Sequence, residues 1–247
     1  MNPLEDLINA KNIVSISPFN HQKVYNGVTW RIDFIVKFLK TKTQTLFLVM
    51  RSDKKNLKSS FSPDLICGSS NKYLHLLNPI LIIKISRLLL KNKNNSILYC
   101  HTYLSWFYGI FFRVFFWIPF IFDDHNVEFE RFKSCRSPLT LLVFIFEFIL
   151  IKLSLLTITS SFQDQQRISS LYFATNIFVI ENFFEKSVWL KINRTSILEH
   201  LDLPNNKKII LFYGSFDYFP NKEALNFIGT FISPFLNPEK YSIVVRS

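Results

Sequence analysis

One short stretch limits the fold more than any other part of the chain. Residues 119–131 read PFIFDDHNVEFER, so an apolar run ends abruptly in two carboxylates, a histidine and an amide. An apolar run without alternation is typical of a strand buried on both faces, as in parallel sheets. Polar side chains just past such a strand lie where open α/β sheets hold their ligands. The stretch therefore predicts a parallel sheet with a ligand site at its edge.

The same signals recur along the chain. Short apolar runs predict strands, and apolar residues spaced three and four apart predict helices. The predicted strands are 11–18, 45–50, 97–100, 120–122, 157–161, 176–180, 209–215 and 241–245, and the predicted helices are 28–40, 78–90, 103–116, 137–155 and 222–231. Regular alternation of strands and helices indicates an α/β protein with a doubly wound parallel sheet.

A polar and less regular stretch divides the chain. We assign residues 1–185 to an N-terminal domain, 186–206 to a linker and 207–247 to the beginning of a C-terminal domain. A segment of about 40 residues is too short to bury a core of its own. We therefore expect the second domain to be incomplete in this sequence.

Charge and cysteine content narrow the functional classes. The net charge of +11 favours contact with an anionic membrane surface, nucleotide phosphates or nucleic acid, although a Lys- and Asn-rich composition explains it equally well. No aromatic-basic pattern of a nucleic-acid module is present, so we expect no nucleic-acid partner. The three cysteines show neither metal spacing nor a disulfide framework, and residues 1–12 lack an apolar signal segment. We expect a cytoplasmic protein.

Two apolar stretches, 104–122 and 139–158, are long enough to span a membrane. The first contains Arg113 and the second contains Glu147 and Lys152. A charge at the centre of a membrane helix costs roughly 2.5–3.5 kcal/mol on insertion scales. Buried or interfacial helices are therefore favoured, and a non-enzymatic membrane protein with two spans stays as the alternative.

Two positions in the sequence suit ligand binding, a glycine before a predicted helix and a histidine after a predicted strand. Gly27, just before a predicted helix, allows the backbone to approach an anion, although an ordinary turn glycine fits equally well. His125 follows a strand end, where Asp123 or Asp124 would orient its imidazole. The competing interpretation is that His125 and Asn126 cap the following helix.

Four segments together resemble the nucleotide-sugar-dependent glycosyltransferases of family 4, which have the GT-B fold. The stretch Asp123–Glu128, with Arg131 one turn later, is similar to the family's Asp-x-His-Asn-x-Glu segment. The other matching segments are 13–31, 179–183 and 211–221, the last similar to Gly-Ser-x-x-Tyr-x-Pro-Asn. The family's Glu-x7-Glu element would lie beyond residue 247. The resemblance thus implies an acceptor-side domain followed by part of a donor-side domain, inactive by itself.

The resemblance implies a hexosyl-type transferase of cell-surface polysaccharide biosynthesis. It would move a sugar from a nucleotide-sugar donor to a hydroxyl of a glycan or lipid-linked acceptor, without a metal or other cofactor. A peripheral position on the inner, anionic face of the membrane fits the basic charge. The implied roles are catalytic for His125 and Asp124, donor-phosphate binding for Gly27, Gly214 and Ser215, and acceptor-side for His101, Asn126 and Glu128. We expect Glu128 and Arg131 to form a supporting ion pair.

Overall fold

The structure is a computed structural model, and it describes residues 12–18, 27–49, 65–66, 78–182, 193, 195, 198–199, 203, 205–214, 216 and 219–246. The chain divides into two compact units, Met1–Phe184 and Glu185–Ser247. Ser215 lies outside the described residues.

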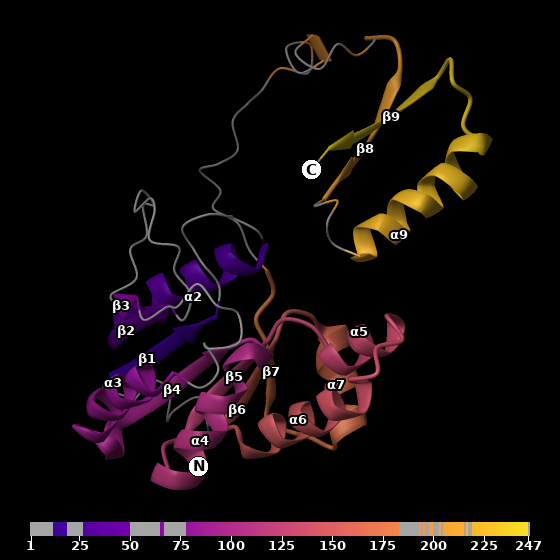
Figure 1. Ribbon diagram of the computed structural model, residues 1–247. Helices are drawn as coiled ribbons and strands as arrows, with labels where there is room; N and C mark the ends of the chain where they lie inside the picture. Colours follow the sequence, from indigo (N-terminus) through magenta and orange to yellow (C-terminus); the bar gives the residue numbers. More distant parts are fainter. Residues whose placement is uncertain are drawn as a thin grey trace. The chain divides into compact units, whose positions relative to one another are not determined.

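A seven-stranded parallel sheet forms the centre of the first unit (Figure 1). Its strand order is β3-β2-β1-β4-β5-β6-β7, so the order reverses between β1 and β4. The strands are β1 (Asn12–Ser17), β2 (Gln44–Val49), β3 (Leu65–Ile66), β4 (Ser96–His101), β5 (Phe120–Asp124), β6 (Leu156–Thr159) and β7 (Ile177–Val179). β4 and β5 are buried along their whole length, which confirms the prediction that both faces of the sheet are covered.

Helices cover both faces of this sheet (Figure 1). Apolar residues of α2 pack with Ile121 and Ile158 on one face, and those of α3, α4, α6 and α7 pack with Phe120 and Phe122 on the other. The helices are α2 (Gly27–Lys42), α3 (Pro79–Leu90), α4 (Trp106–Phe116), α5 (Glu128–Ser134), α6 (Thr140–Leu153) and α7 (Phe162–Tyr172), with short 3₁₀ turns η1 (Lys93–Asn95) and η2 (Tyr103–Ser105). The unit is thus an α/β doubly wound domain, as predicted.

Local sequence signals explain where several helices begin. Asn78 is the N-cap of α3, and its side chain accepts hydrogen bonds from the backbone N–H groups of Ile80 and Leu81 at 3.0 and 3.4 Å. Pro79 follows at the first helical position, where its missing N–H is not needed. Ser161 caps α7 in the same way by accepting from the backbone N–H of Asp164 at 3.1 Å.

The approach of α4 to the sheet depends on a glycine. A Cβ atom on Gly109 would lie 3.0 Å from the ring of Phe120 and 3.3 Å from Sγ of Cys100. The helix ends at Trp117, which has φ 59° and donates its backbone N–H to the carbonyl of Arg113. Pro119 then precedes the buried strand β5. The aromatic helix and the central strand are therefore packed directly against one another.

The second unit contains a parallel pair of strands, β8 (Lys208–Tyr213) and β9 (Tyr241–Arg246). Between them the chain forms α9 (Phe219–Phe227), the π-helical turn η4 (Ile228–Ile232) and the 3₁₀ turn η5 (Ser233–Phe235). This strand-helix-strand order confirms the predicted elements of residues 209–245.

The structure decides between the two interpretations of the apolar stretches. Residues 104–122 are divided between α4 and the sheet strand β5, and residues 139–158 between α6 and β6. No helix in the described part of the chain has both the length and the apolarity needed to cross a membrane. The alternative with two spans is therefore wrong, because the end of each stretch is a strand of the central sheet. The short strand β3 is an element that the sequence did not predict.

Candidate functional site

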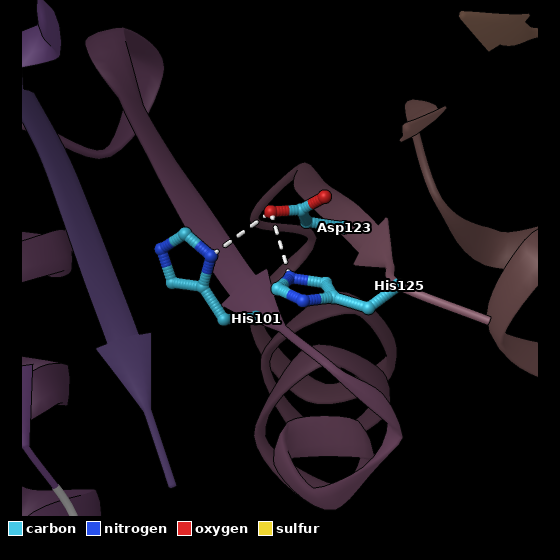
Figure 2. Close-up of side chains that lie close together, drawn as sticks. All are labelled: His101, Asp123 and His125. Carbon is cyan, nitrogen blue, oxygen red and sulfur yellow. Dashed lines mark hydrogen bonds and ion pairs between the residues drawn. The ribbon is translucent and has the colours of Figure 1, made fainter. Parts of the chain in front are cut away.

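The candidate site lies at the carboxyl ends of two buried, paired strands. β4 pairs with β5 so that His101 lies opposite Asp123, each at the carboxyl end of its strand. His125 follows β5 by one residue and turns back toward the same carboxylate. Figure 2 shows the imidazole rings of both histidines directed at Asp123. The three side chains meet because parallel pairing brings the carboxyl ends of β4 and β5 to the same edge of the sheet.

Asp123 is the centre of this network. Its Oδ2 lies 3.1 Å from Nδ1 of His101 and 3.3 Å from Nε2 of His125. Its Oδ1 accepts hydrogen bonds from Nη2 and Nε of Arg31 at 3.0 and 3.3 Å. Burial by itself would raise the pKa of Asp123, but His125, His101 and Arg31 hold this pKa well below its ordinary value. Asp123 is therefore an ionised carboxylate inside the protein.

The charge of Asp123 determines the hydrogen-bond direction at both histidines. An ionised carboxylate only accepts hydrogen bonds, so Nδ1 of His101 and Nε2 of His125 must each carry a proton. In neutral His101, Nε2 is then an acceptor for the hydroxyl of Ser15, 2.9 Å away. In neutral His125, Nδ1 is the remaining basic nitrogen. The network thus fixes the tautomer of the histidine that the sequence singled out.

Arg31, in α2, connects Asp123 to the ends of β6 and β7. Its guanidinium donates to the backbone carbonyl of Ile180, to Oδ1 of Asn182 at 3.4 Å and to the carbonyl of Thr159 at 3.5 Å. These acceptors lie at the end of β6 and just after β7, whereas Arg31 belongs to α2. The residue is 2% exposed. One buried guanidinium therefore ties α2 to the carboxyl ends of three neighbouring strands.

Asp124 lies on the opposite face of the sheet from Asp123. Successive side chains of a strand alternate in direction, so Asp124 faces α6 and interacts with Glu147. Burial and the negative charges of Glu147 and Glu128 raise the pKa of Asp124 well above its ordinary value. Neither carboxyl oxygen accepts a hydrogen bond from a donor among the described residues. Burial and the neighbouring carboxyl groups therefore favour the protonated form of Asp124.

Glu147 is the acidic partner of Asp124. It accepts the backbone N–H groups of Glu128 and Phe129 at 2.8 and 3.0 Å, and the hydroxyl of Tyr172 donates to it as well. Burial raises the pKa of Glu147, and these three hydrogen bonds act in the opposite direction. The carboxylate therefore holds the first turn of α5, which starts just after His125.

The predicted ion pair between Glu128 and Arg131 is confirmed. Nε of Arg131 donates to Oε2 of Glu128 at 2.7 Å, and Nη2 contacts the same oxygen. The guanidinium also lies near the Tyr103 hydroxyl, at 3.4 Å. Burial raises the pKa of Glu128 despite this partner. Glu128 is thus held by one arginine and faces the Asp124–Glu147 pair.

The structure places the other predicted site residues as follows. Asn126 is exposed beside His125, whereas His101 is fully buried, so His101 supports Asp123 and does not itself face the solvent. Gly27 begins α2, and a Cβ atom there would meet no atom of the described residues within 4 Å. A Cβ atom on Gly214 would lie 2.6 Å from Nδ2 of Asn221, so any larger residue there requires the asparagine side chain to move. Of the two carboxylates expected to orient His125, Asp123 does so and Asp124 does not.

Several residues of the site were not predicted. Arg31, Ser15 and Tyr172 carry no local signal, because their partners are distant in the sequence. Glu147 did carry one: it is the only acidic residue in the apolar segment 139–158. An unpaired carboxylate in such a helix is costly, so a partner in the core was to be expected.

His101, Asp123 and His125 also satisfy a geometric condition for binding a metal. In the described part of the chain, one ligand atom of each lies within 4.8 Å of the others. We interpret the group as a hydrogen-bonded network, because the guanidinium of Arg31 already neutralises the carboxylate at 3.0 Å and would repel a cation. The expectation that no metal is required stays a prediction.

Comparisons with known proteins identify the fold. No protein-family model matches the chain, and no curated protein matches it. Among solved structures, sucrose-phosphate synthase from Thermosynechococcus elongatus superposes with a TM-score of 0.62 at 10% identity, over 96% of this chain and 71% of that one. The catalytic domain of starch synthase IV from Arabidopsis thaliana gives 0.61 at 11% identity, over 96% and 68%. The fold is of the GT-B type.

A third similar structure has a different stated activity. A putative UDP-N-acetylglucosamine 2-epimerase from Listeria monocytogenes superposes with a TM-score of 0.57 at 12% identity, over 95% of this chain. The chain spans 62% of the length of that protein. At such identities the likeness concerns the fold alone, and the GT-B fold is compatible with more than one reaction of nucleotide sugars.

Proposed function

We propose that this chain belongs to a glycosyltransferase resembling family 4, which transfers a sugar from a nucleotide-sugar donor to a hydroxyl group. The observation that carries the proposal is His125, held through Nε2 by ionised Asp123 at the carboxyl ends of β4 and β5. A polar group held in one orientation near a reacting centre is a common requirement of catalysis.

The sheet topology supports the location of the site. In open parallel sheets, ligands bind outside the carboxyl ends of the strands, where the strand order reverses. Here the order reverses between β1 and β4. Ser15 of β1 and His101 of β4 are joined by a hydrogen bond, and Asp123 follows on the next strand. The network is therefore at the position expected for a bound ligand.

The proposed chemistry uses the network as a support for His125. The acceptor oxygen bonds to the anomeric carbon, the bond from that carbon to the donor diphosphate breaks, and the acceptor proton leaves. Nδ1 of His125 would hydrogen-bond to the sugar or receive this proton. Ionised Asp123 would stabilise the resulting imidazolium, in the way that a carboxylate supports a general-base histidine.

Gly27, Gly214 and Ser215 remain the proposed donor-phosphate residues. Gly27 is the first residue of α2, and the 16 residues of this helix give it a dipole whose positive end favours an anion. Among the described residues, no atom lies within 4 Å of a Cβ atom built on Gly27, which is compatible with a phosphate bound there. On the acceptor side we retain the exposed Asn126 together with Glu128, and the acceptor is a glycan or a lipid-linked glycan.

Because residues 1–247 are expected to be inactive by themselves, the proposal is tested with a version that has a complete donor-side domain, and with a panel of UDP-, GDP-, ADP- and dTDP-sugars. Binding by calorimetry and release of nucleoside diphosphate are measured for the wild type, for His125→Ala and for a control with the exposed Gln163 of α7 replaced by alanine. We expect one nucleotide class to bind all three proteins. Release should fall by about a hundredfold in His125→Ala alone. Absence of binding to every nucleotide sugar would overturn the proposal.

A second candidate reaction is epimerisation of a nucleotide sugar, since a protein described as such an epimerase has the same fold. The two reactions are separated by their products. Epimerisation gives a new nucleotide sugar in the absence of any acceptor, which NMR of the sugar ring detects. Glycosyl transfer gives free nucleoside diphosphate and a glycoside, and its rate depends on the acceptor.

A further inference from the structure

Three helices on the same face of the sheet carry exposed apolar side chains. α3, α4 and α6 all pack on the cluster that contains Phe120 and Phe122, and they lie along this face in Figure 1. On α3, Ile80 and Ile83 are on the outer side, 60% and 51% exposed. These residues point away from the core, since Leu81 and Ile85 of the same helix are buried.

The exposed apolar surface continues on the other two helices. Phe115 of α4 is 68% exposed and Leu141 of α6 is 70% exposed, and Ile145 lies one turn after Leu141. The two helices are in direct contact, with the ring of Trp106 4.5 Å from that of Phe146. We call the outer side of α3, α4 and α6 the apolar face. Single exposed apolar residues are normal, but a set spread over three neighbouring helices indicates an interaction surface.

The charges on this face have one sign. Residues 78–122 contain no Asp or Glu, and the only acidic residue of α6 is the buried Glu147. Basic residues are present throughout: Arg87, Lys91 and Lys93 are exposed on and after α3, and Lys152 is exposed on α6. The apolar face is therefore cationic, with no exposed carboxylate on its three helices.

We propose that the apolar face docks onto an anionic lipid bilayer. Apolar side chains beside Lys and Arg suit an interface of acyl chains and anionic head groups. A second copy of this chain is a poorer occupant, because two cationic faces would repel each other and neither offers a carboxylate to the other. This inference is independent of the proposed function, since binding to lipid requires neither a donor nor a transfer step.

The test is flotation of the full chain with vesicles of phosphatidylcholine, with and without phosphatidylglycerol. One triple variant replaces exposed apolar residues of the face by serine: Phe115, Leu141 and Ile145. Its control makes the same replacement at exposed positions of the second unit: Leu211, Phe231 and Phe235. A charge variant changes Arg87, Lys91 and Lys93 to glutamine, and its control changes Lys208, Lys222 and Lys240. All substituted positions are at the surface, and thermal unfolding verifies that each variant is folded.

We expect the wild type to float with phosphatidylglycerol vesicles, and to float less at high salt. The partition coefficient should fall about tenfold in the apolar and the charge variants of the face, and change little in both controls. Equal flotation of a face variant and its control overturns the proposal, as does the failure of the wild type to float. If ultracentrifugation without lipid shows a dimer that the apolar variant abolishes, the face is instead a contact between copies.

Discussion

Asp123 and Asp124 are adjacent in β5, yet their carboxyl groups lie on opposite faces of the sheet and their pKa values are shifted in opposite directions. Asp123 meets the guanidinium of Arg31 and two histidines, whereas Asp124 meets the carboxylate of Glu147. The surroundings therefore favour the charged form of Asp123 and the protonated form of Asp124. This difference leads to distinct predictions for the two residues.

Asp124→Asn should become more stable relative to the wild type as the pH rises. The folded-state pKa of Asp124 is raised, so its favourable contribution is complete below the unfolded pKa of about 3.9 and declines above it. While Asp124 keeps its proton, the wild type loses about 1.4 kcal/mol per pH unit relative to the variant. Urea unfolding of both proteins at a series of pH values that starts below the unfolded-state pKa of about 3.9 and continues well above it measures this slope. A difference independent of pH contradicts a protonated Asp124.

Asp123→Asn should destabilise the protein and disorder the site. The substitution leaves Arg31 buried without an anion, and breaking a buried ion pair in this way costs about 3–5 kcal/mol. The folded-state pKa of Asp123 is lowered, so its contribution is present above about pH 3.9 and is lost as the pH falls through the folded-state pKa. The difference from wild type should therefore shrink in acid.

The double variant Arg31→Gln/Asp123→Asn provides the control for this pair. Removing both charges should cost less than the sum of the two single substitutions, because no buried charge is left unpaired. Chemical denaturation of the four proteins gives the coupling free energy. Additive effects would mean that the two side chains do not interact.

Gly214→Ala should destabilise the second unit through a specific clash. The new methyl group would lie 2.6 Å from Nδ2 and 3.0 Å from Cγ of Asn221, so the asparagine side chain must move. We expect a loss of about 1–3 kcal/mol, typical of overpacking. Combining the substitution with Asn221→Ala should recover part of this loss, whereas Asn221→Ala alone should not stabilise the protein. Unfolding followed by tyrosine fluorescence measures both effects.

At position 102, glycine should give a more stable protein than alanine. It follows His101 with φ 64° and ψ 165°, a backbone conformation that residues with a Cβ atom rarely adopt. Glycine releases the strain and alanine retains it, so Thr102→Gly should be more stable than Thr102→Ala by about 1 kcal/mol. At an ordinary position alanine is the more stable of the two. The midpoints of thermal unfolding decide the order.

Sequence patterns predicted the first unit because its elements follow local rules. Apolar runs such as Phe120–Phe122 and the spacing of Ile32, Ile35 and Leu39 depend only on near neighbours, and the strands and helices appear where these patterns place them. β3 was missed because a strand of two residues has no periodicity to detect. Its pairing with Leu48 and Val49 is a long-range property of the fold.

The site was predicted less completely, because its contacts join residues that are distant in the sequence. The sequence located His125 among carboxylates, but it left open which carboxylate orients the imidazole. Strand alternation separates Asp123 from Asp124, and this rule applies only once the strand is known to continue to residue 124. Arg31 is 92 positions away from Asp123, so no local pattern connects them.

The opposite directions of the two carboxylates also limit which insertions, deletions and substitutions β5 can accept. Side chains of β5 alternate between the two faces of the sheet, so moving the strand by one residue turns each side chain to the other face. A one-residue deletion before Asp123 would turn its carboxylate away from Arg31 and toward the apolar cluster that contains Phe120 and Phe122. Substitutions in Phe120–Phe122 that preserve apolar volume should therefore be tolerated, whereas single-residue insertions and deletions there should not.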